Sequence, residues 1–308
     1  MIPANALQYS RHVRITVVVP TFRRPDALAD CLDALAQQTL ARTEYEVVVV
    51  DNATPPTAAA TVRAFEPRLE LRSLHEPARG PAAARNAGAR VARAAHIAFT
   101  DDDCRPAPGW LAALMEAIER DPTALIGGET LDGRPESLCS AASHLLVSHF
   151  TARQNVDPAA PAFFASNNLA APARELAALG GFDARFPRAA GEDRDLCERW
   201  RAHGLRLVHA PHAVVRHAPS LTLWGFLRQQ MAYGRGAFAV HQARARRPRP
   251  ETRLEGPAFY LELVARPYRI ARLPRATALT GLVLLSQAAL FAGYVAEGAG
   301  LKGFRSGG

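Results

Sequence analysis

Continuous apolar runs, each ending in polar residues, recur through the first hundred residues of the chain. RITVVVP (14–20) and YEVVVVDNATPP (45–56) are rich in valine, LELRSLH (69–75) is more mixed, and HIAFTDD (96–102) completes the series. Strands buried on both faces have this continuous apolar composition, and such strands belong to largely parallel sheets. The runs therefore predict a parallel β-sheet at the centre of the fold.

Amphipathic helices are predicted between these strands. Pro25 begins the first helix, Pro81 begins another that reaches about residue 95, and PGWLAALMEAIERD (108–121) forms a third. The first helix has one apolar face at the spacing i, i+3, i+4 and i+7, formed by Leu28, Cys31, Leu32 and Leu35. This alternation predicts an α/β fold with a Rossmann-like, mostly parallel sheet and helices on both faces.

Beyond residue 125 the pattern is less regular. A strand is predicted at 163–172, a helix at 191–204, and two short strands around Pro211. We expect a catalytic domain over residues 1–218 and a helical, arginine-rich region over 219–308.

Charge and cysteine content narrow the class of protein. The formal net charge is +8 and the pI is about 9.9, so an anionic partner such as a nucleotide or a membrane surface is expected. The four cysteines have no CxxC or metal-ligand spacing, which indicates a reducing compartment. The N-terminal residues lack the apolar stretch of a signal peptide, so the bulk of the protein is expected to be cytoplasmic.

Three adjacent carboxylates, Asp101, Asp102 and Asp103, follow the fourth predicted strand. In an extended segment Asp101 and Asp103 point to one side and Asp102 to the other. Two such charges about 4 Å apart repel by about 4 kcal/mol at an effective dielectric constant near 20, and a divalent cation removes this repulsion. Mg²⁺ takes one or two carboxylates together with phosphate oxygens and water. The alternative is a solvated acidic turn that caps the next helix.

A basic loop-to-helix junction precedes the triplet. EPARGPAAARNAGARVA places Arg79, Gly80, Arg85 and Asn86 where a helix begins, and a helix N-terminus with arginines can hold a diphosphate. The glycine pattern matches neither a Walker A loop nor GxGxxG. A solvated basic helix face is the alternative.

A second acidic group begins a later helix. GEDRDL contains Glu192, Asp193 and Asp195, and a carboxylate here can act as a general base. Acidic residues also favour helix N-termini because of the helix dipole. His217, at the end of a predicted strand, is a candidate for metal or phosphate contact, although single histidines are commonly structural.

The order of these motifs resembles the family 2 glycosyltransferases with the GT-A fold. The matching segments are VVVPTFRRPDALADCLDAL, VVVVDNAT, RGPAAARNAGA, FTDDDCRP, LGGFD and GEDRDL, which together cover about residues 14–217. The resemblance implies an inverting transfer of a sugar from a nucleotide-diphosphate donor to a hydroxyl group of a glycan or lipid-linked acceptor. It also implies a divalent metal, Mg²⁺ or Mn²⁺, at the DxD-like triplet.

The resemblance assigns roles to the matching positions. Asp193 would be the catalytic base with Glu192 beside it. Asp103 would bind the metal, with Asp101 and His217 as further candidate ligands. Asp51 would hold the base of the nucleotide, and Asp101 or Asp102 would contact its ribose. The other nucleotide-sugar contacts would come from Pro20, Thr21, Arg23, Arg79, Arg85 and Asn86. The sugar and acceptor pocket would be shaped by Asn167, Asn168, Gly181, Phe182 and Asp183.

The C-terminal region suggests membrane association. Residues 244–275 contain nine Arg and three Glu, and the uncharged stretch 276–296 is long enough to cross a bilayer. Basic residues before it favour the cytoplasmic face of the membrane. A single span, peripheral association and a buried core helix are all open.

Two other classes of protein stay open. A nucleotidyltransferase would carry a glycine-rich phosphate loop directly after the first strand, where this chain has PTFRRPD. A non-enzymatic basic membrane- or nucleic-acid-binding protein would bind without a divalent metal. Because the basic residues are not interleaved with aromatic residues, no nucleic-acid partner is expected.

Overall fold

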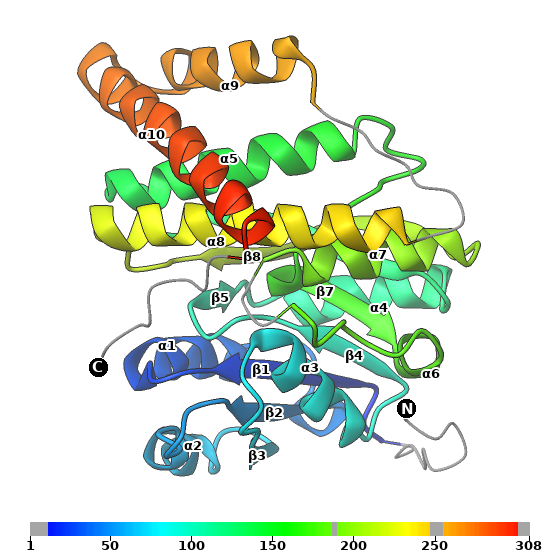
Figure 1. Cartoon of the computed structure of the whole chain (residues 1–308). Coiled ribbons are helices and arrows are strands. Elements are labelled where there is room, and N and C mark those ends of the chain that lie inside the picture. Colours follow the sequence, from blue (N-terminus) through cyan, green and yellow to red (C-terminus); the bar gives the residue numbers. More distant parts are fainter. Residues whose placement is uncertain (1–11, 187–189, 247–254, 301–308) are drawn as a thin grey trace.

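The structure is a computed structural model that describes residues 12–186, 190–246 and 255–300. An eight-stranded sheet in the order β3-β2-β1-β4-β7-β6-β8-β5 forms its centre (Figure 1). The strands are β1 (Ile15–Thr21), β2 (Tyr45–Asp51), β3 (Leu71–His75), β4 (His96–Phe99), β5 (Cys104–Pro106), β6 (Leu125–Asp132), β7 (Leu169–Pro172) and β8 (Leu207–His217). The helices are α1 (Pro25–Ala36), α2 (Ala59–Phe65), α3 (Pro81–Arg90), α4 (Trp110–Arg120), α5 (Leu138–Gln154), α6 (Ala173–Ala178), α7 (Glu192–Ala202), α8 (Leu223–Ala245), α9 (Pro257–Ile270) and α10 (Leu273–Gly298). Two 3₁₀ turns, η2 (Arg42–Glu44) and η3 (Ser166–Asn168), complete them.

The N-terminal half of the sheet is parallel, as predicted. β1 pairs with β2 and β4, and β2 pairs with β3, all in parallel register. Thr21 and Asp51 are register partners at the carboxyl ends of β1 and β2. The polar residues that end the apolar runs therefore meet at one edge of the sheet, where α/β proteins bind ligands.

The other half of the sheet is mixed, so the sheet is less parallel than its first strands suggest. β7 is antiparallel to β4 and β6, and β5 is antiparallel to β8. The strand predicted at 163–172 begins only at Leu169, because η3 precedes it. The two strands predicted around Pro211 are one strand, β8, whose register with β6 shifts between Gly128 and Glu129.

Apolar side chains alternate between the two faces of the sheet. Val17 and Val19 of β1 pack with α1, α2 and α4 on one face. Val18 of β1, with Val48 and Val50 of β2, packs with α3, α6 and α7 on the other face. This confirms that the sheet is covered by helices on both faces.

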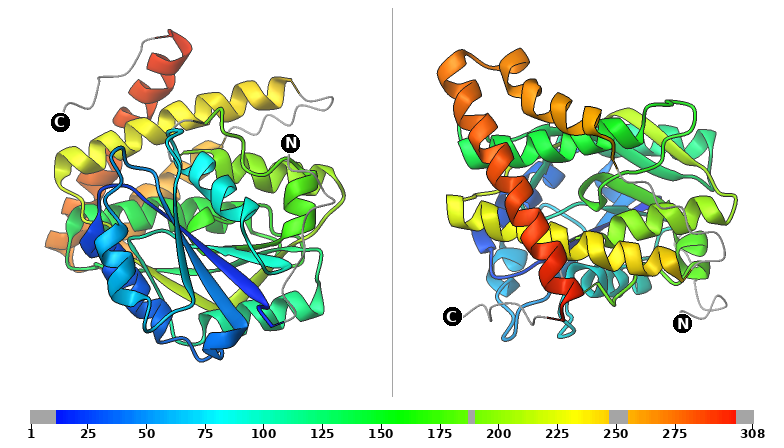
Figure 2. Two further views of the ribbon diagram at one scale, coloured as in Figure 1. Left: turned by 90° about the horizontal axis from the view of Figure 1, so that it is seen from below. Right: turned by 45° about the horizontal axis from the view of Figure 1, so that its top comes forward.

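The C-terminal helices form a further layer outside the sheet. α10 crosses α8 and also contacts α5 and α9 (Figures 1 and 2). α10 has 26 residues and a mean hydropathy of 1.7 over its most apolar window, so it is long and apolar enough to cross a membrane. The predicted domain boundary at residue 218 stays a prediction, and part of the arginine-rich stretch 244–275 lies outside the described residues.

Candidate active site

The Asp triplet lies in a turn and not in an extended segment. The Cys104 amide donates to the Asp101 carbonyl at 3.0 Å, which turns the chain directly after β4. The expected alternation of the three side chains is therefore wrong. Asp102 and Asp103 share one arginine, whereas Asp101 pairs with Arg85 at 2.7 Å.

Arg24 is the arginine that holds two of the three carboxylates, and the sequence did not single it out. Its guanidinium lies 2.5 Å from Asp102 Oδ1 and 2.6 Å from Asp103 Oδ2. The neighbouring Arg23, predicted as the nucleotide contact, has φ of 53° and an exposed side chain that only approaches the Thr54 carbonyl at 3.4 Å. The sequence shows two arginines before Pro25, but the backbone turn at Arg23 decides which of the two side chains reaches the carboxylates.

The pKa values of Asp102 and Asp103 are shifted in opposite directions. Asp102 is fully buried, accepts a hydrogen bond from Thr21 Oγ1 at 2.8 Å, and has its pKa raised by burial to about 7. Burial would also raise the pKa of Asp103, but His217 and Arg24 together hold it well below its usual range. Asp103 is therefore the carboxylate that stays charged.

Asp103 and His217 bring together donor atoms that could hold a metal ion. Their Oδ1 and Nε2 atoms lie 3.3 Å apart, and Cys104 completes a group whose ligand atoms lie within 4.8 Å of one another. Burial raises the pKa of the Cys104 thiol well above its usual value, so the carboxylate and imidazole suit a hard divalent cation better. The two residues fit a Mg²⁺ or Mn²⁺ ion completed by water and phosphate oxygens. Asp101 does not belong to this group, since its carboxylate faces Arg85.

The second acidic group begins α7. Gly191, with φ of 93°, precedes it. Glu192 is buried, and burial together with the charge of Asp193 raises its pKa to about 7. Asp193 accepts backbone hydrogen bonds from Arg194 at 2.7 Å and Ser166 at 3.5 Å, and burial raises its pKa. Two carboxylates with raised pKa values at one helix start are typical of a functional site.

Arg85 connects the two acidic groups. It is only 2% exposed, and it donates to Asp101 at 2.7 Å and to Glu192 at 2.9 Å. Its guanidinium also lies over the Phe182 ring at 5.5 Å from the centroid. Arg85 was predicted to lie by the nucleotide and its phosphates, and this role stays a prediction. In the structure its two Nη atoms donate to the carboxylates. Its place is between the acidic groups.

Two predicted nucleotide residues organise loops at the sheet edge. Asp51 accepts hydrogen bonds from the amides of Ala53, Thr57 and Ala58, between 2.5 and 2.9 Å. Asn52, the other polar residue at this strand end, holds the 76–80 loop through hydrogen bonds that include the Gly80 amide at 3.0 Å. Both carboxylate oxygens of Asp51 therefore accept hydrogen bonds from the loop that follows β2.

The remaining predicted nucleotide contacts lie at different depths. Pro20 and Thr21 are buried at the end of β1, whereas Arg79 is exposed in the loop before α3. Asn86 exchanges hydrogen bonds of 2.7 and 2.9 Å with the backbone of Phe182. Asn86 thus joins α3 to the glycine turn after α6.

The predicted sugar and acceptor pocket is only partly assembled from the expected residues. Asn168 is buried and accepts from the Trp110 indole at 2.8 Å while donating to the carbonyls of Glu129 and Ala213, so it does not face a pocket. Phe182 is 1% exposed and packs edge-on against Phe99.

The other three positions have contacts of their own. Asn167 is 8% exposed and accepts from Thr130 at 3.5 Å, and Gly181 has φ of 72°. Asp183 pairs with the exposed Arg185 at 2.6 Å. The roles of these three residues stay predictions.

Tyr233 of α8 is a further residue near the site that the sequence did not reveal. Burial raises the pKa of its phenol, and the charges of Asp193 and Glu192 add to that rise. The aromatic ring therefore lies within electrostatic reach of the carboxylates. Within α8 it carries no pattern that distinguishes it from a packing residue.

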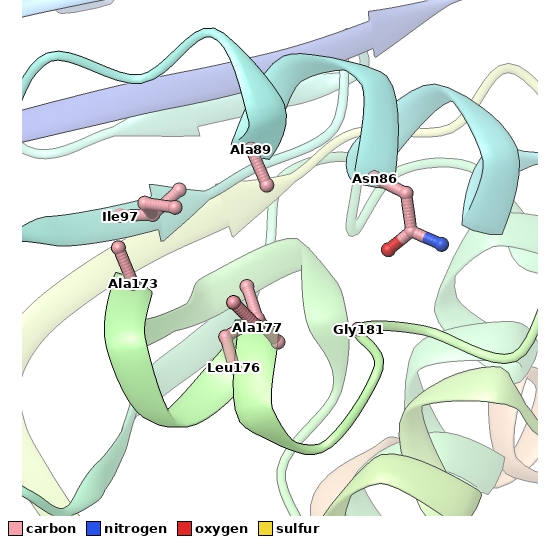
Figure 3. A pocket seen from close by; sticks show the side chains of 7 residues that line it. All are labelled: Asn86, Ala89, Ile97, Ala173, Leu176, Ala177 and Gly181. Atoms are coloured by element: carbon pink, nitrogen blue, oxygen red, sulfur yellow. The ribbon is translucent and has the colours of Figure 1, made fainter. Parts of the chain in front are cut away.

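A small hollow lies between α3 and α6, next to Asn86 (Figure 3). None of the residues that line it is acidic. Its cavity volume is only about 10 Å³, and its walls are mostly apolar. It is lined by Asn86, Ala89, Ile97, Ala173, Leu176, Ala177 and Gly181. The hollow is too small to hold a sugar nucleotide.

Comparison with known proteins shows the family of the chain. The description "Glycosyl transferase family 2" matches residues 16–167, and "Glycosyl transferase family group 2" matches residues 96–299. The chain belongs to the family 2 glycosyltransferases. This confirms the resemblance noted in the sequence.

Characterised relatives of this family are similar over most of the chain. Validoxylamine A glucosyltransferase of Streptomyces hygroscopicus subsp. jinggangensis (strain 5008) is 29% identical over 240 residues, which cover 64% of this chain and 56% of the relative. Glycosyltransferase AglE of Haloferax volcanii is 25% identical over 229 residues, covering 73% of each. The chain thus spans little more than half the length of the first relative.

Solved structures show the same fold. The mannosyltransferase PcManGT from Pyrobaculum calidifontis, in complex with GDP-Man and Mn²⁺, superposes with a TM-score of 0.64 at 22% identity, over 95% of this chain and 89% of its own. S. aureus TarS 1–349 in complex with UDP-GlcNAc has a TM-score of 0.56 at 14% identity, over 93% and 91%. The predicted GT-A fold is confirmed.

Proposed function

We propose that the protein transfers a sugar from a nucleotide-diphosphate donor to a hydroxyl group with inversion at the anomeric carbon. The observation that carries this proposal is the pair of acidic groups, Asp101–Asp103 and Glu192–Asp193, linked through Arg85 at one end of the sheet. One group suits a diphosphate with its metal, and the other suits an attacking hydroxyl group. The transfer needs both functions in one site.

Asp103 and His217 are proposed to hold the divalent metal of the donor. The metal would supply charge neutralisation for the departing diphosphate. Arg24 contacts both Asp102 and Asp103, so its cation lies where the donor phosphates would approach. The Mn²⁺ and GDP-Man bound by PcManGT and the UDP-GlcNAc bound by TarS support such a donor.

Asp193 is proposed as the general base. It accepts backbone hydrogen bonds, and among the residues that the structure describes no arginine pairs directly with its carboxylate. Its raised pKa makes it a better proton acceptor than an ordinary aspartate. Its carboxylate would take the proton of the acceptor hydroxyl group as that oxygen attacks the anomeric carbon. Glu192, held by Arg85, would position the start of α7.

The acceptor is proposed to be a glycan or a lipid-linked molecule at the cytoplasmic face of a membrane. The apolar helix α10 and the basic residues before it support this localisation.

The test is a panel of sugar nucleotides screened for Mn²⁺-dependent hydrolysis and binding. We expect one donor class to be hydrolysed by the wild-type chain and not by Asp103→Asn. Asp33→Asn, which changes an exposed carboxylate on α1, is the matched control and should behave as wild type. Unchanged Mn²⁺-dependent hydrolysis by Asp103→Asn would refute the metal assignment.

A further inference from the structure

We propose that α9 and α10 form a hairpin that lies in the plane of an anionic membrane surface, with one face on lipid and the other on α5 and α8. The hairpin would then present the active site to an acceptor that arrives from the lipid surface. This last step rests on the proposed transferase function, whereas the mode of membrane binding does not.

Exposed apolar side chains are concentrated on this part of the molecule. Fifteen large apolar side chains are exposed among the described residues, and eleven of them lie between residues 223 and 295. They include Trp224 at 65% exposure, Leu261 at 72% and Phe291 at 67%. All eleven lie on α8, α9 and α10, and α10 contacts the other two helices. Exposed apolar side chains gathered on neighbouring helices in this way mark a site of protein or membrane contact.

α10 has two distinct faces, and both are apolar. Its buried face repeats at Ala276, Leu279, Val283, Ser286 and Gly293. Its outer face, between residues 277 and 295, contains the exposed Leu284, Leu285, Phe291 and Val295 and has no charged residue. A helix facing water would place polar residues there, so the outer face suits hydrocarbon.

The buried face holds α10 on α8, which argues against a transmembrane span. A Cβ atom on Gly293 would lie 2.1 Å from the Met231 carbonyl, and one on Gly234 would lie 1.9 Å from the Leu290 carbonyl. The two helices therefore touch backbone to backbone, and Arg235 pairs with Glu297 at 2.8 Å beside this crossing. Crossing a bilayer would take α10 away from α8, because α8 carries arginines that hydrocarbon excludes.

Charge complementarity selects an anionic lipid surface as the partner. Arg266, Arg269, Arg272 and Arg275 lie within ten residues at the turn between α9 and α10, where the hairpin extends away from the sheet (Figure 1). Tyr268, Ile270 and Leu273 are exposed among them. Arginines beside exposed apolar side chains suit the interface between lipid headgroups and acyl chains.

α8 connects this surface to the active site. Tyr233 lies within electrostatic reach of the carboxylates of the site, while the adjacent Gly234 touches α10. Since a helix with its side chains is about 10–12 Å across, the outer face of α10 lies on the order of 10–20 Å from the site. A hydroxyl group carried by a membrane molecule can reach the site over this distance.

The binding test is flotation of the full chain with vesicles of phosphatidylcholine, with and without phosphatidylglycerol. Leu284→Glu/Phe291→Glu should abolish flotation with both, because both side chains point outward. Arg269→Gln/Arg272→Gln should weaken binding to the anionic vesicles by about 25-fold, about fivefold for each arginine. Val91→Glu and Arg63→Gln/Arg201→Gln, which change exposed residues elsewhere, are the matched controls. Flotation that all variants share with wild type would overturn the proposal.

The orientation test uses cysteines at the two ends of α10, Thr277→Cys and Ala299→Cys, in a Cys139→Ser background. In sealed membrane vesicles from expressing cells, a membrane-impermeant maleimide should label both positions from the same side. Labelling from opposite sides would show a span and overturn the in-plane arrangement. Donor binding measured on the flotation variants should equal that of wild type, so loss of membrane binding is separable from failure of the transferase proposal.

Discussion

Replacing Arg85 by methionine tests the link between the two acidic groups. The guanidinium makes charge-assisted hydrogen bonds of 2.7 Å to Asp101 and 2.9 Å to Glu192. The side chain of Asp101 is 26% exposed and can be hydrated, but that of Glu192 is 3% exposed and would lose its cationic partner. Removing one member of a buried ion pair costs about 3–5 kcal/mol. Because Glu192 can bind a proton instead, we expect the lower end of this range, about 3 kcal/mol at pH 8.

The loss of folding stability in Arg85→Met should increase as the pH rises. Burial already raises the pKa of Glu192 to about 7, and loss of Arg85 raises it further. A carboxyl group whose pKa is higher in the folded state than in the unfolded state destabilises the fold as pH rises. Between about 7, the folded-state pKa of Glu192 in wild type, and its higher folded-state pKa in the variant, only the variant loses stability, by up to about 1.4 kcal/mol for each pH unit. Arg85→Met should therefore be closer to wild type at pH 6 than at pH 8.

Urea unfolding at both pH values measures these free energies. Arg85→Met/Glu192→Gln should recover part of the lost stability, since no unpaired carboxylate remains. Arg72→Met, which removes a partner of the buried Glu46 far from the site, is a control that should lower stability without changing nucleotide binding. A double variant whose loss equals the sum of the two single losses would refute the coupling of Arg85 to Glu192.

Further outcomes follow from other residues. The value of kcat/KM for transfer should fall as the pH decreases through a pKa above the ordinary aspartate value. The reason is that Asp193 must be unprotonated to act as a base and its pKa is raised. A pH profile that stays level down to pH 4.5 would contradict this. Gly293→Ala should loosen α10 and expose it to limited proteolysis, whereas Gly281→Ala, which meets nothing within 4 Å, should leave it protected. Asn168→Ala should destabilise the fold by about 2–4 kcal/mol in calorimetry, because the Trp110 indole and two carbonyl groups lose their partner.

The parallel half of the fold could be predicted because its signal is local. Strands β1 and β2 are continuous in apolar residues, and Pro25 and Pro81 begin helices α1 and α3 as expected. β5, β6 and α5 were not predicted. β5 has only three residues, and β6 contains two glycines and becomes polar towards its end. Neither strand therefore shows a clear periodicity of apolar residues.

The acidic groups of the site could be located from the sequence, but their contacts could not. Asp103 and His217 meet because β5 pairs with β8, a contact between residues more than a hundred positions apart. The inward turn of Arg24 depends on the backbone at Arg23. Tyr233 reaches the site only through the way α8 packs on the catalytic part, which leaves no sequence pattern.

The most direct test of the two-group site measures nucleotide binding and sugar transfer on the same Asp193→Asn protein. We predict that Mn²⁺-dependent binding of the nucleoside diphosphate stays within about threefold of wild type, while transfer falls by about 10²–10⁴-fold, the contribution expected of a general base. Loss of nucleotide binding, or transfer at the wild-type rate, would contradict the assignment of donor and base to separate acidic groups.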